Sequence, residues 1–165
     1  ITGGNGFIGT RLVNVLSKKG HKITLIDPIV RENIGPNINQ INCDFREVNK
    51  FINALKDTEL VIHLAALLGV DNCEKSAGST LKANGSRACQ FFDLCKESGV
   101  SKIIYTSSSE VYGDVEEAKE TSQVAPKSNY ALAKLYSERY LETITSNTFS
   151  SIVPVSYTHL TLPTS

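Results

Sequence analysis

The chain has 165 residues, of which 41% are hydrophobic and 21% are charged, enough to bury the core of one ordinary domain. Lys plus Arg and Asp plus Glu number 17 each, so the net charge is zero, which argues against binding to a nucleic-acid backbone or an anionic membrane surface. No apolar run approaches the length of a bilayer helix, and no secretory leader pattern is visible. We therefore expect a cytoplasmic protein.

Both ends of the sequence are unusual. The glycine loop begins only two residues after the first residue, Ile1, and the chain contains no Met. We therefore expect a fragment that lacks most of its first strand. The stretch Val155 to Ser165 is similar to the translation of a sequencing-library adaptor, although a short strand is the alternative. We predict one domain over residues 1–155 and a non-native tail over residues 156–165.

The predicted elements alternate along the chain between short apolar runs and longer amphipathic stretches. After the glycine loop, apolar residues recur at helical spacing from Phe7 and stop at Lys18-Lys19-Gly20. The later predicted elements, in chain order, are a strand at 22–26, a strand at about 38–43, a helix at about 46–55, a strand at 60–64, a helix at about 79–97, a strand at 102–106, a helix at 128–145 and a strand at 151–155. This alternation predicts an α/β fold with a doubly wound parallel sheet, whose strands end along one ligand-binding edge.

The four cysteines carry no recognisable metal or disulfide pattern. Cys43, Cys73, Cys89 and Cys95 show neither a C-x-x-C pair nor metal-like spacing. Buried thiols in a reducing compartment explain them best, so we expect no metal site.

The opening loop fits a dinucleotide-binding fingerprint. Residues 4–9 read G-x-G-x-x-G, and Gly3, Gly6 and Gly9 also fit the variant spaced by three residues. Such a loop lets a pyrophosphate approach bare backbone at a helix N-terminus. Asp27, at the end of the next strand, would accept hydrogen bonds from ribose hydroxyls and repel a 2′-phosphate, which favours NAD. Arg31 keeps NADP as an alternative, and a purely structural glycine turn is another.

A second pattern lies far along the chain. Tyr130 and Lys134 form Y-x-x-x-K on a predicted helix, so they share one face one turn apart. They follow a serine-rich segment that leaves the strand at 102–106. An ordinary helix pair and a polar loop are the alternatives.

Together these pieces resemble the extended short-chain dehydrogenase/reductases, also called the NAD-dependent epimerase/dehydratase family. The matching motifs are TGGNGFIG at 2–9, Asp27, Asp44-Phe45, HLAA at 63–66, Asn84, SSSEVYG at 107–113 and YALAK at 130–134. The resemblance implies a Rossmann fold, NAD as cofactor, a nucleotide-sugar as substrate and a C-terminal substrate lobe that this chain lacks. It also implies a homodimer formed through the last two long helices, for which Phe91, Phe92, Leu94 and Tyr136 are candidates, with a core role as the alternative.

The resemblance assigns chemical roles to individual residues. Tyr130 would be the general base, Lys134 would stabilise its phenolate, and Ser108 would bind the reacting hydroxyl. Ser109 and Glu110 resemble the dehydratases and decarboxylases, in which the glutamate transfers protons, whereas a solvated loop carboxylate is the alternative. The candidate catalytic residues are Ser108, Ser109, Glu110, Tyr130 and Lys134. The candidate cofactor-binding residues are Gly3, Gly6, Phe7, Ile8, Gly9, Asp27, Asp44, Phe45, Leu64, Ala65, Ala66, Ser107, Tyr130 and Lys134.

Several points stay open from sequence alone. His63 is expected to be a packed core histidine, and Asn84 is expected to be mainly structural. Epimerase, dehydratase and decarboxylase chemistry are not distinguished, and the isolated chain is expected to be inactive. The alternatives are an NAD(P)-dependent reductase of a steroid or flavonoid-like substrate and a non-catalytic NAD(H)-binding module.

Overall fold

The computed structural model describes residues 1–32, 34–68, 76–115 and 117–156, so Cys73 and residues 157–165 of the predicted tail lie outside the described residues. Every strand pair in it is parallel. The strands are β1 (Ile23–Asp27), β2 (Ile38–Asn42), β3 (Leu60–His63), β4 (Lys102–Tyr105), β5 (Ser107–Ser108), β6 (Ser150–Ile152) and β7 (Val155–Ser156). The predicted parallel sheet is confirmed.

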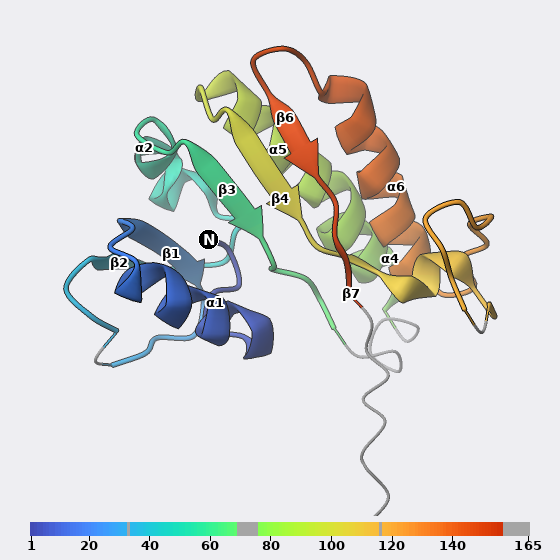
Figure 1. Cartoon of the computed structure of the whole chain (residues 1–165), viewed down its shortest axis with the longest axis horizontal. Helices are drawn as coiled ribbons and strands as arrows, with labels where there is room; N and C mark the ends of the chain where they lie inside the picture. Colours follow the sequence, from blue (N-terminus) through green and yellow to red (C-terminus); the bar gives the residue numbers. More distant parts are fainter. Residues whose placement is uncertain (33, 69–75, 116, 157–165) are drawn as a thin grey trace, which may run out of the picture.

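The second residue of the chain completes the centre of this sheet. β1 pairs with β2, and β3 pairs with β4, which pairs with β6. Thr2 lies between the two groups, with parallel bridges to Ile26 of β1 and His63 of β3. The spatial order is therefore β2, β1, Thr2, β3, β4 and β6 (Figure 1). Because the strand order reverses at Thr2, the ligand edge of the sheet begins at the glycine loop that follows it.

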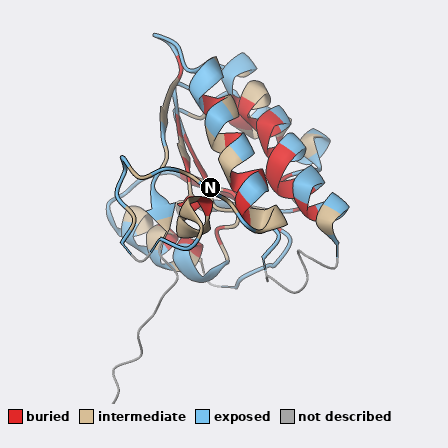
Figure 2. Cartoon of the chain, turned by 90° about the vertical axis from the view of Figure 1, so that its right-hand side faces the viewer, coloured by how far each residue is buried: buried red, intermediate tan, exposed pale blue. Residues whose placement is uncertain are grey.

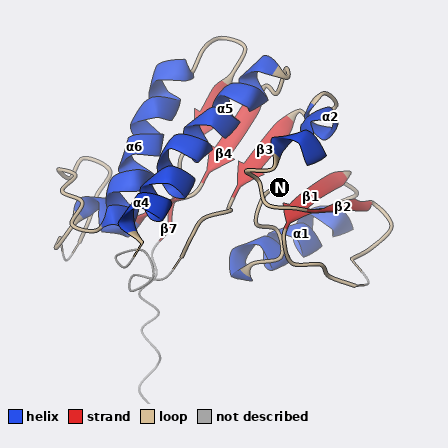
Figure 3. Cartoon of the chain, turned by 180° about the vertical axis from the view of Figure 1, so that it is seen from behind, coloured by secondary structure: helices blue, strands red, loops and turns tan. Residues whose placement is uncertain are grey.

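The helical segments cover both faces of the sheet. Leu25 packs with Val13 of helix α1 (Phe7–Lys18), whereas Ile26 belongs to the cluster that contains Phe91 of α5 (Ala88–Glu97). Since successive side chains of a strand point to opposite faces, α1 and α5 cover opposite faces of the sheet. Helix α6 (Asn129–Ile144) lies beside α5 (Figures 1 and 3). Figure 2 shows buried positions concentrated where these two helices meet the sheet.

One predicted helix contains an unexpected irregularity. The stretch predicted at 79–97 consists of α4 (Ala77–Thr80), a π-helix η2 (Leu81–Arg87) and α5, which follow one another without a break. The sequence pattern shows the amphipathic face but not the wider turn in its middle. Widened turns of this kind occur often at functional sites.

Two other predicted elements are shorter than expected. The helix predicted at 46–55 is a 3-10 turn η1 (Val48–Lys50) followed by α2 (Ile52–Leu55). Phe51, between the two elements, and Leu55, at the end of α2, are both buried. The last predicted strand is divided between β6 and β7. Pro154 lies at the division, and its missing amide cannot donate to a strand ladder.

The three described cysteines, Cys43, Cys89 and Cys95, are buried free thiols. Burial raises the pKa of Cys89 to about 11 and that of Cys95 to about 12. They are structural thiols, as the sequence predicts for these three. Among the described residues, no helix combines the length and apolar character that crossing a membrane requires.

Candidate active site

The glycine loop directly after Thr2 leaves no space for side chains at two positions. Gly3 has a φ of +68°, and a Cβ atom there would lie 2.7 Å from the amide nitrogen of Ala65. A Cβ atom on Gly9 would collide with the carbonyl oxygen of Gly3. Helix α1 starts after Gly6, whose position offers no side-chain cap to the first amides of the helix. The loop is therefore a bare-backbone cradle at a helix N-terminus, which suits a diphosphate.

Phe7 and Ile8 form the first turn of α1, and their side chains point away from the core. The two residues are 77% and 47% exposed. The guanidinium of Arg11 lies 5.8 Å from the centre of the Phe7 ring. Their contribution to cofactor binding stays a prediction.

Asp27, the last residue of β1, is hydrogen-bonded to the glycine loop. The Oδ2 atom accepts a hydrogen bond of 2.9 Å from the amide of Asn5, and Oδ1 accepts one of 2.8 Å from the amide of Ile29. The residue is 5% exposed. A carboxylate has lone pairs for further donors, so these bonds leave the predicted contact with ribose hydroxyls available.

Asp44 is half-buried and its neighbour Phe45 is buried. Asp44 makes a bidentate ion pair with Arg46, with both contacts at 2.7 Å, and this bond holds the pKa of Asp44 below its usual range. The Phe45 ring packs edge-on against His63 at a centroid distance of 4.9 Å and is 6% exposed. The Phe45 ring therefore belongs to the core, and the contact of Asp44 and Phe45 with the adenine stays a prediction.

The segment after β3 is half-buried and held at both ends. The amide of Leu64 donates to the Thr2 carbonyl at 3.1 Å, and the Ala65 backbone fills the space beside Gly3. The Asn84 side chain of η2 makes two hydrogen bonds with the Leu67 backbone: it accepts from the amide at 2.8 Å and donates to the carbonyl at 2.9 Å. Leu64, Ala65 and Ala66 are thereby kept beside the glycine loop, and the expected structural role of Asn84 is confirmed.

The serine-rich segment leaves β4 and turns into a short 3-10 helix η3 (Ser109–Tyr112). Ser108 is 4% exposed and caps this helix, since its Oγ accepts from the Glu110 amide at 3.3 Å. The Ser107 amide donates to the Pro154 carbonyl at 2.9 Å. Ser109 is half-buried at the first position of η3. The structure thus places all three serines directly beyond the end of β4.

Glu110 connects this segment to the helix that bears Tyr130. Its Oε2 accepts a hydrogen bond of 2.9 Å from the Ser128 hydroxyl, and the same hydroxyl caps α6 by accepting from the Ala131 amide at 3.0 Å. Glu110 is half-buried. The carboxylate is therefore held by a defined partner, which differs from the alternative of a freely solvated loop residue.

Lys134 is anchored where β4 ends. Its Nζ donates to the Thr106 carbonyl at 2.8 Å and lies 4.5 Å from the centre of the Tyr105 ring and 5.8 Å from that of Tyr130. The residue is 3% exposed, and burial lowers its pKa to about 8. Because α6 also packs against β5 and η3, the half-buried Tyr130 lies on the helix turn nearest the serines.

One contact at this site was not predicted. The Ser107 hydroxyl donates a hydrogen bond to Oε1 of Glu138, one turn after Lys134 on α6. Sequence spacing places Glu138 and Lys134 on one helix face, and that periodicity was the available signal. This periodicity does not reveal that Ser107, which belongs to a separate element, lies against the same face of α6.

A doubly wound parallel sheet with a bare glycine cradle at its switch point is the architecture of a dinucleotide-binding domain. The family model described as "NAD dependent epimerase/dehydratase family" matches residues 1–164, and the chain belongs to this family. NAD is accordingly its cofactor. The match runs into residues 156–164, and the non-native tail stays a prediction.

Individual relatives cover the chain in part. It is 36% identical over 129 residues to a dTDP-D-glucose 4,6-dehydratase from Dictyostelium discoideum, covering 68% of this chain and 29% of that protein. A UDP-N-acetyl-alpha-D-glucosaminuronate decarboxylase from Bacillus cytotoxicus is 32% identical over 119 residues, covering 68% of this chain and 37% of the decarboxylase. The structure of MoeE5 in complex with UDP-glucose and NAD superposes with a TM-score of 0.80 at 29% identity, covering 93% of this chain and 51% of MoeE5. The chain thus spans about half the length of these proteins or less.

Proposed function

We propose that this chain is the NAD-binding half of an enzyme that oxidises a hydroxyl of a nucleotide-linked sugar to a ketone. The observation that carries the proposal is the buried Lys134 ammonium, held at the exit of β4 between the Tyr130 ring and the serine segment. The relatives support the substrate class, since the two relatives are named for nucleotide-linked sugars and MoeE5 was solved with UDP-glucose.

The cradle fits the diphosphate of NAD because Gly3 and Gly9 bring backbone where a Cβ would collide. The amides of Phe7 and Ile8 would point at the diphosphate, Asp27 would bind the adenosine ribose, and Asp44 with the Phe45 backbone would border the adenine. Leu64 to Ala66 and Ser107 would line the nicotinamide side. When bound, NAD supplies the acceptor for the hydride.

The chain's own residues handle the proton. Tyr130 would accept the proton of the sugar hydroxyl, although a free tyrosine has a pKa near 10. The positive charge of Lys134 beside its ring favours the phenolate, and a pKa of about 8 keeps that charge largely in place at neutral pH. Ser108 would donate a hydrogen bond to the reacting oxygen and hold it toward Tyr130.

Glu110 supports a proton-transfer step after the oxidation. A ketone acidifies the neighbouring C–H bond, and dehydration or decarboxylation then needs a nearby acid or base. Glu110 is fixed by Ser128 beside Ser108 and Ser109, whereas an epimerase needs no carboxylate there. Product analysis of the intact enzyme with Glu110→Gln tests this role: accumulation of the ketosugar is expected, and unchanged product formation would exclude it.

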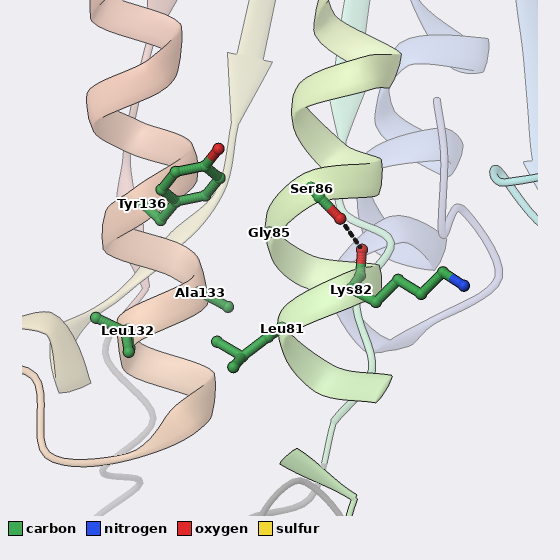
Figure 4. Close-up of a pocket in the computed structure, with 7 residues that line it drawn as sticks. All are labelled: Leu81, Lys82, Gly85, Ser86, Leu132, Ala133 and Tyr136. Carbon is green, nitrogen blue, oxygen red and sulfur yellow. Dashed lines mark hydrogen bonds between the residues drawn. The ribbon is translucent and has the colours of Figure 1, made fainter. Parts of the chain in front are cut away.

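An apolar hollow between η2 and α6 supports the proposed homodimer. This open hollow has a volume of about 530 Å³, and Figure 4 shows the residues that line it. Tyr136 and Leu132 are about half exposed there, at 54% and 49%. Phe91 and Phe92 of the expected stripe are buried in the core, so their alternative role holds and they are not available to a partner. Leu132→Glu should convert the intact enzyme from dimer to monomer in sedimentation velocity.

The decisive experiment offers the intact enzyme UDP- and dTDP-linked hexoses and follows NADH absorbance in a single turnover. Reduction of NAD that depends on Tyr130 supports the proposal. Binding of NAD without turnover of any sugar nucleotide would favour the non-catalytic module. Tighter binding of NADP than NAD would favour the reductase alternative, and Asp27→Asn should shift the preference toward NADP. The isolated 165-residue chain is expected to remain inactive.

A further inference from the structure

Two side chains on α6 hold two consecutive residues of the segment that leaves β4. Lys134 Nζ donates to the Thr106 carbonyl at 2.8 Å, and the Ser107 hydroxyl donates to Oε1 of Glu138. Lys134 and Glu138 are four residues apart, so they project from the same helix face. The residue that follows Ser107 in the chain is Ser108, the proposed partner of the sugar hydroxyl.

Glu138 is also the nearby negative charge for a buried cation. The groups that face the Lys134 ammonium are the rings of Tyr105 from β4 and Tyr130 from α6, with His63 of β3 coupled to it electrostatically. Burial lowers the pKa of Lys134, and the charge of Glu138 opposes this by raising it.

The Glu138 carboxyl has its own surroundings. Burial and the charge of Glu142 raise its pKa, whereas the Ser107 hydrogen bond, Arg139 and Lys134 lower it. Burial is the largest of these influences, so the pKa of Glu138 lies above the usual value of a carboxyl. An anionic Glu138 is the form that both accepts from Ser107 and balances Lys134.

We propose that Glu138 is a positioning residue of this active site, which fixes the strand segment that presents Ser108 and supplies the negative charge that balances the Lys134 ammonium. The inference rests on the proposed oxidation of a sugar hydroxyl. It separates two contributions of one side chain, a mechanical one through Ser107 and an electrostatic one through Lys134.

Three variants of the intact enzyme separate these contributions. Glu138→Gln keeps an oxygen acceptor for Ser107 but removes the charge, whereas Ser107→Ala removes the hydrogen bond and keeps the charge. Glu142→Gln is the matched control, because it removes the same charge one turn further along α6, where Glu142 pairs with Arg139 on the surface. The first readout is the pH titration of the Lys134 13Cε shift in the absence of NAD, assigned with Lys134→Arg. The second is the pH dependence of single-turnover NAD reduction.

Glu138→Gln is expected to lower the Lys134 titration midpoint by about half a pH unit, a roughly threefold change in the protonation equilibrium, and to move the pH profile of NAD reduction with it. Ser107→Ala is expected to slow NAD reduction about tenfold without moving the midpoint, on the scale of one misplaced hydrogen bond. Glu142→Gln should change neither. If the Lys134 titration midpoint is the same in Glu138→Gln and Glu142→Gln, the electrostatic part is overturned. If Ser107→Ala reduces NAD at the wild-type rate, the mechanical part is overturned. This second test does not require Glu138→Gln to fold. The wild type could fail to reduce NAD with any sugar nucleotide while the Lys134 titration midpoint is still lower in Glu138→Gln. In that case the proposed function is wrong, but the electrostatic interaction between Glu138 and Lys134 is supported.

Discussion

The Thr2 hydroxyl oxygen lies 2.7 Å from Nδ1 of His63, and this contact joins the centre of the sheet to β3. Both residues are 1% exposed. The imidazole is enclosed by aromatic rings, with Phe91 at a centroid distance of 5.1 Å and Tyr105 at 5.8 Å. His63 is therefore the packed core histidine expected from the sequence, and burial lowers its pKa to about 3.

This burial predicts acid-sensitive folding. The folded state keeps His63 neutral down to about pH 3, whereas the unfolded chain protonates it below about pH 6.5. The unfolded state therefore binds more protons in this window, and stability falls as the pH drops through it. His63→Phe, which cannot protonate, should reduce the loss of unfolding free energy between pH 7 and pH 4 by about 3 kcal/mol. Urea unfolding at several pH values measures this, and equal pH slopes in both proteins would contradict the assignment.

Lys134 predicts a dependence of the same sign at alkaline pH. Its pKa is about 8 in the folded state against 10.5 for the free side chain, so the unfolded state holds more protons between these values. Stability contributed by this residue therefore rises with pH across the window. The advantage of Lys134→Met over wild type in unfolding free energy should shrink by about 1–3 kcal/mol from pH 8 to pH 10. The raised pKa values of Cys89 and Cys95 act in both proteins and cancel in the difference.

Much of the fold could be predicted because its determinants are local. The buried run at β3 and the acidic residue that ends β1 mark parallel strands, and the spacing of the glycines marks the turn between a strand and α1. The Y-x-x-x-K pair likewise depends only on helical periodicity. These features need no knowledge of which distant residues meet.

The features that escaped prediction depend on long-range packing. Whether the Phe45 ring faces the cofactor or the core is decided by the space beside His63 and Phe91, which adjacent sequence does not reveal. The contact between Ser107 and Glu138 joins residues from separate elements. The π-helical turn at η2 accompanies bonds from Ser137 on α6, whose hydroxyl donates to the Asn84 carbonyl at 2.8 Å.

The glycine cradle predicts a sharp contrast between two Gly→Ala substitutions. Gly9→Ala would push a Cβ into the Gly3 carbonyl, so we expect weaker NAD binding by at least about tenfold and a loss of stability of about 1–3 kcal/mol. Gly78→Ala is the control, because a Cβ there meets no atom within 4 Å and Gly78 lies in α4. This control should leave NAD binding unchanged and add about 0.5–1 kcal/mol of stability. Calorimetric titration with NAD and urea unfolding measure both, and tight NAD binding by Gly9→Ala would rule out the cradle.

Tyr130 predicts a loss of chemistry without a loss of binding. Tyr130→Phe keeps the ring beside Lys134 but removes the hydroxyl that would accept the substrate proton, so single-turnover NAD reduction in the intact enzyme should fall by about 10²–10⁴-fold. NAD affinity should change by less than about threefold, which corresponds to the lower end of the free energy of one hydrogen bond. Tyr136→Phe is the matched control, because Tyr136 lies on the same helix, is 54% exposed and faces the hollow beside η2 rather than the serine segment. Equal hydride transfer rates in the two variants would remove Tyr130 from the role of general base, since the only difference between them is which phenol on α6 has been deleted.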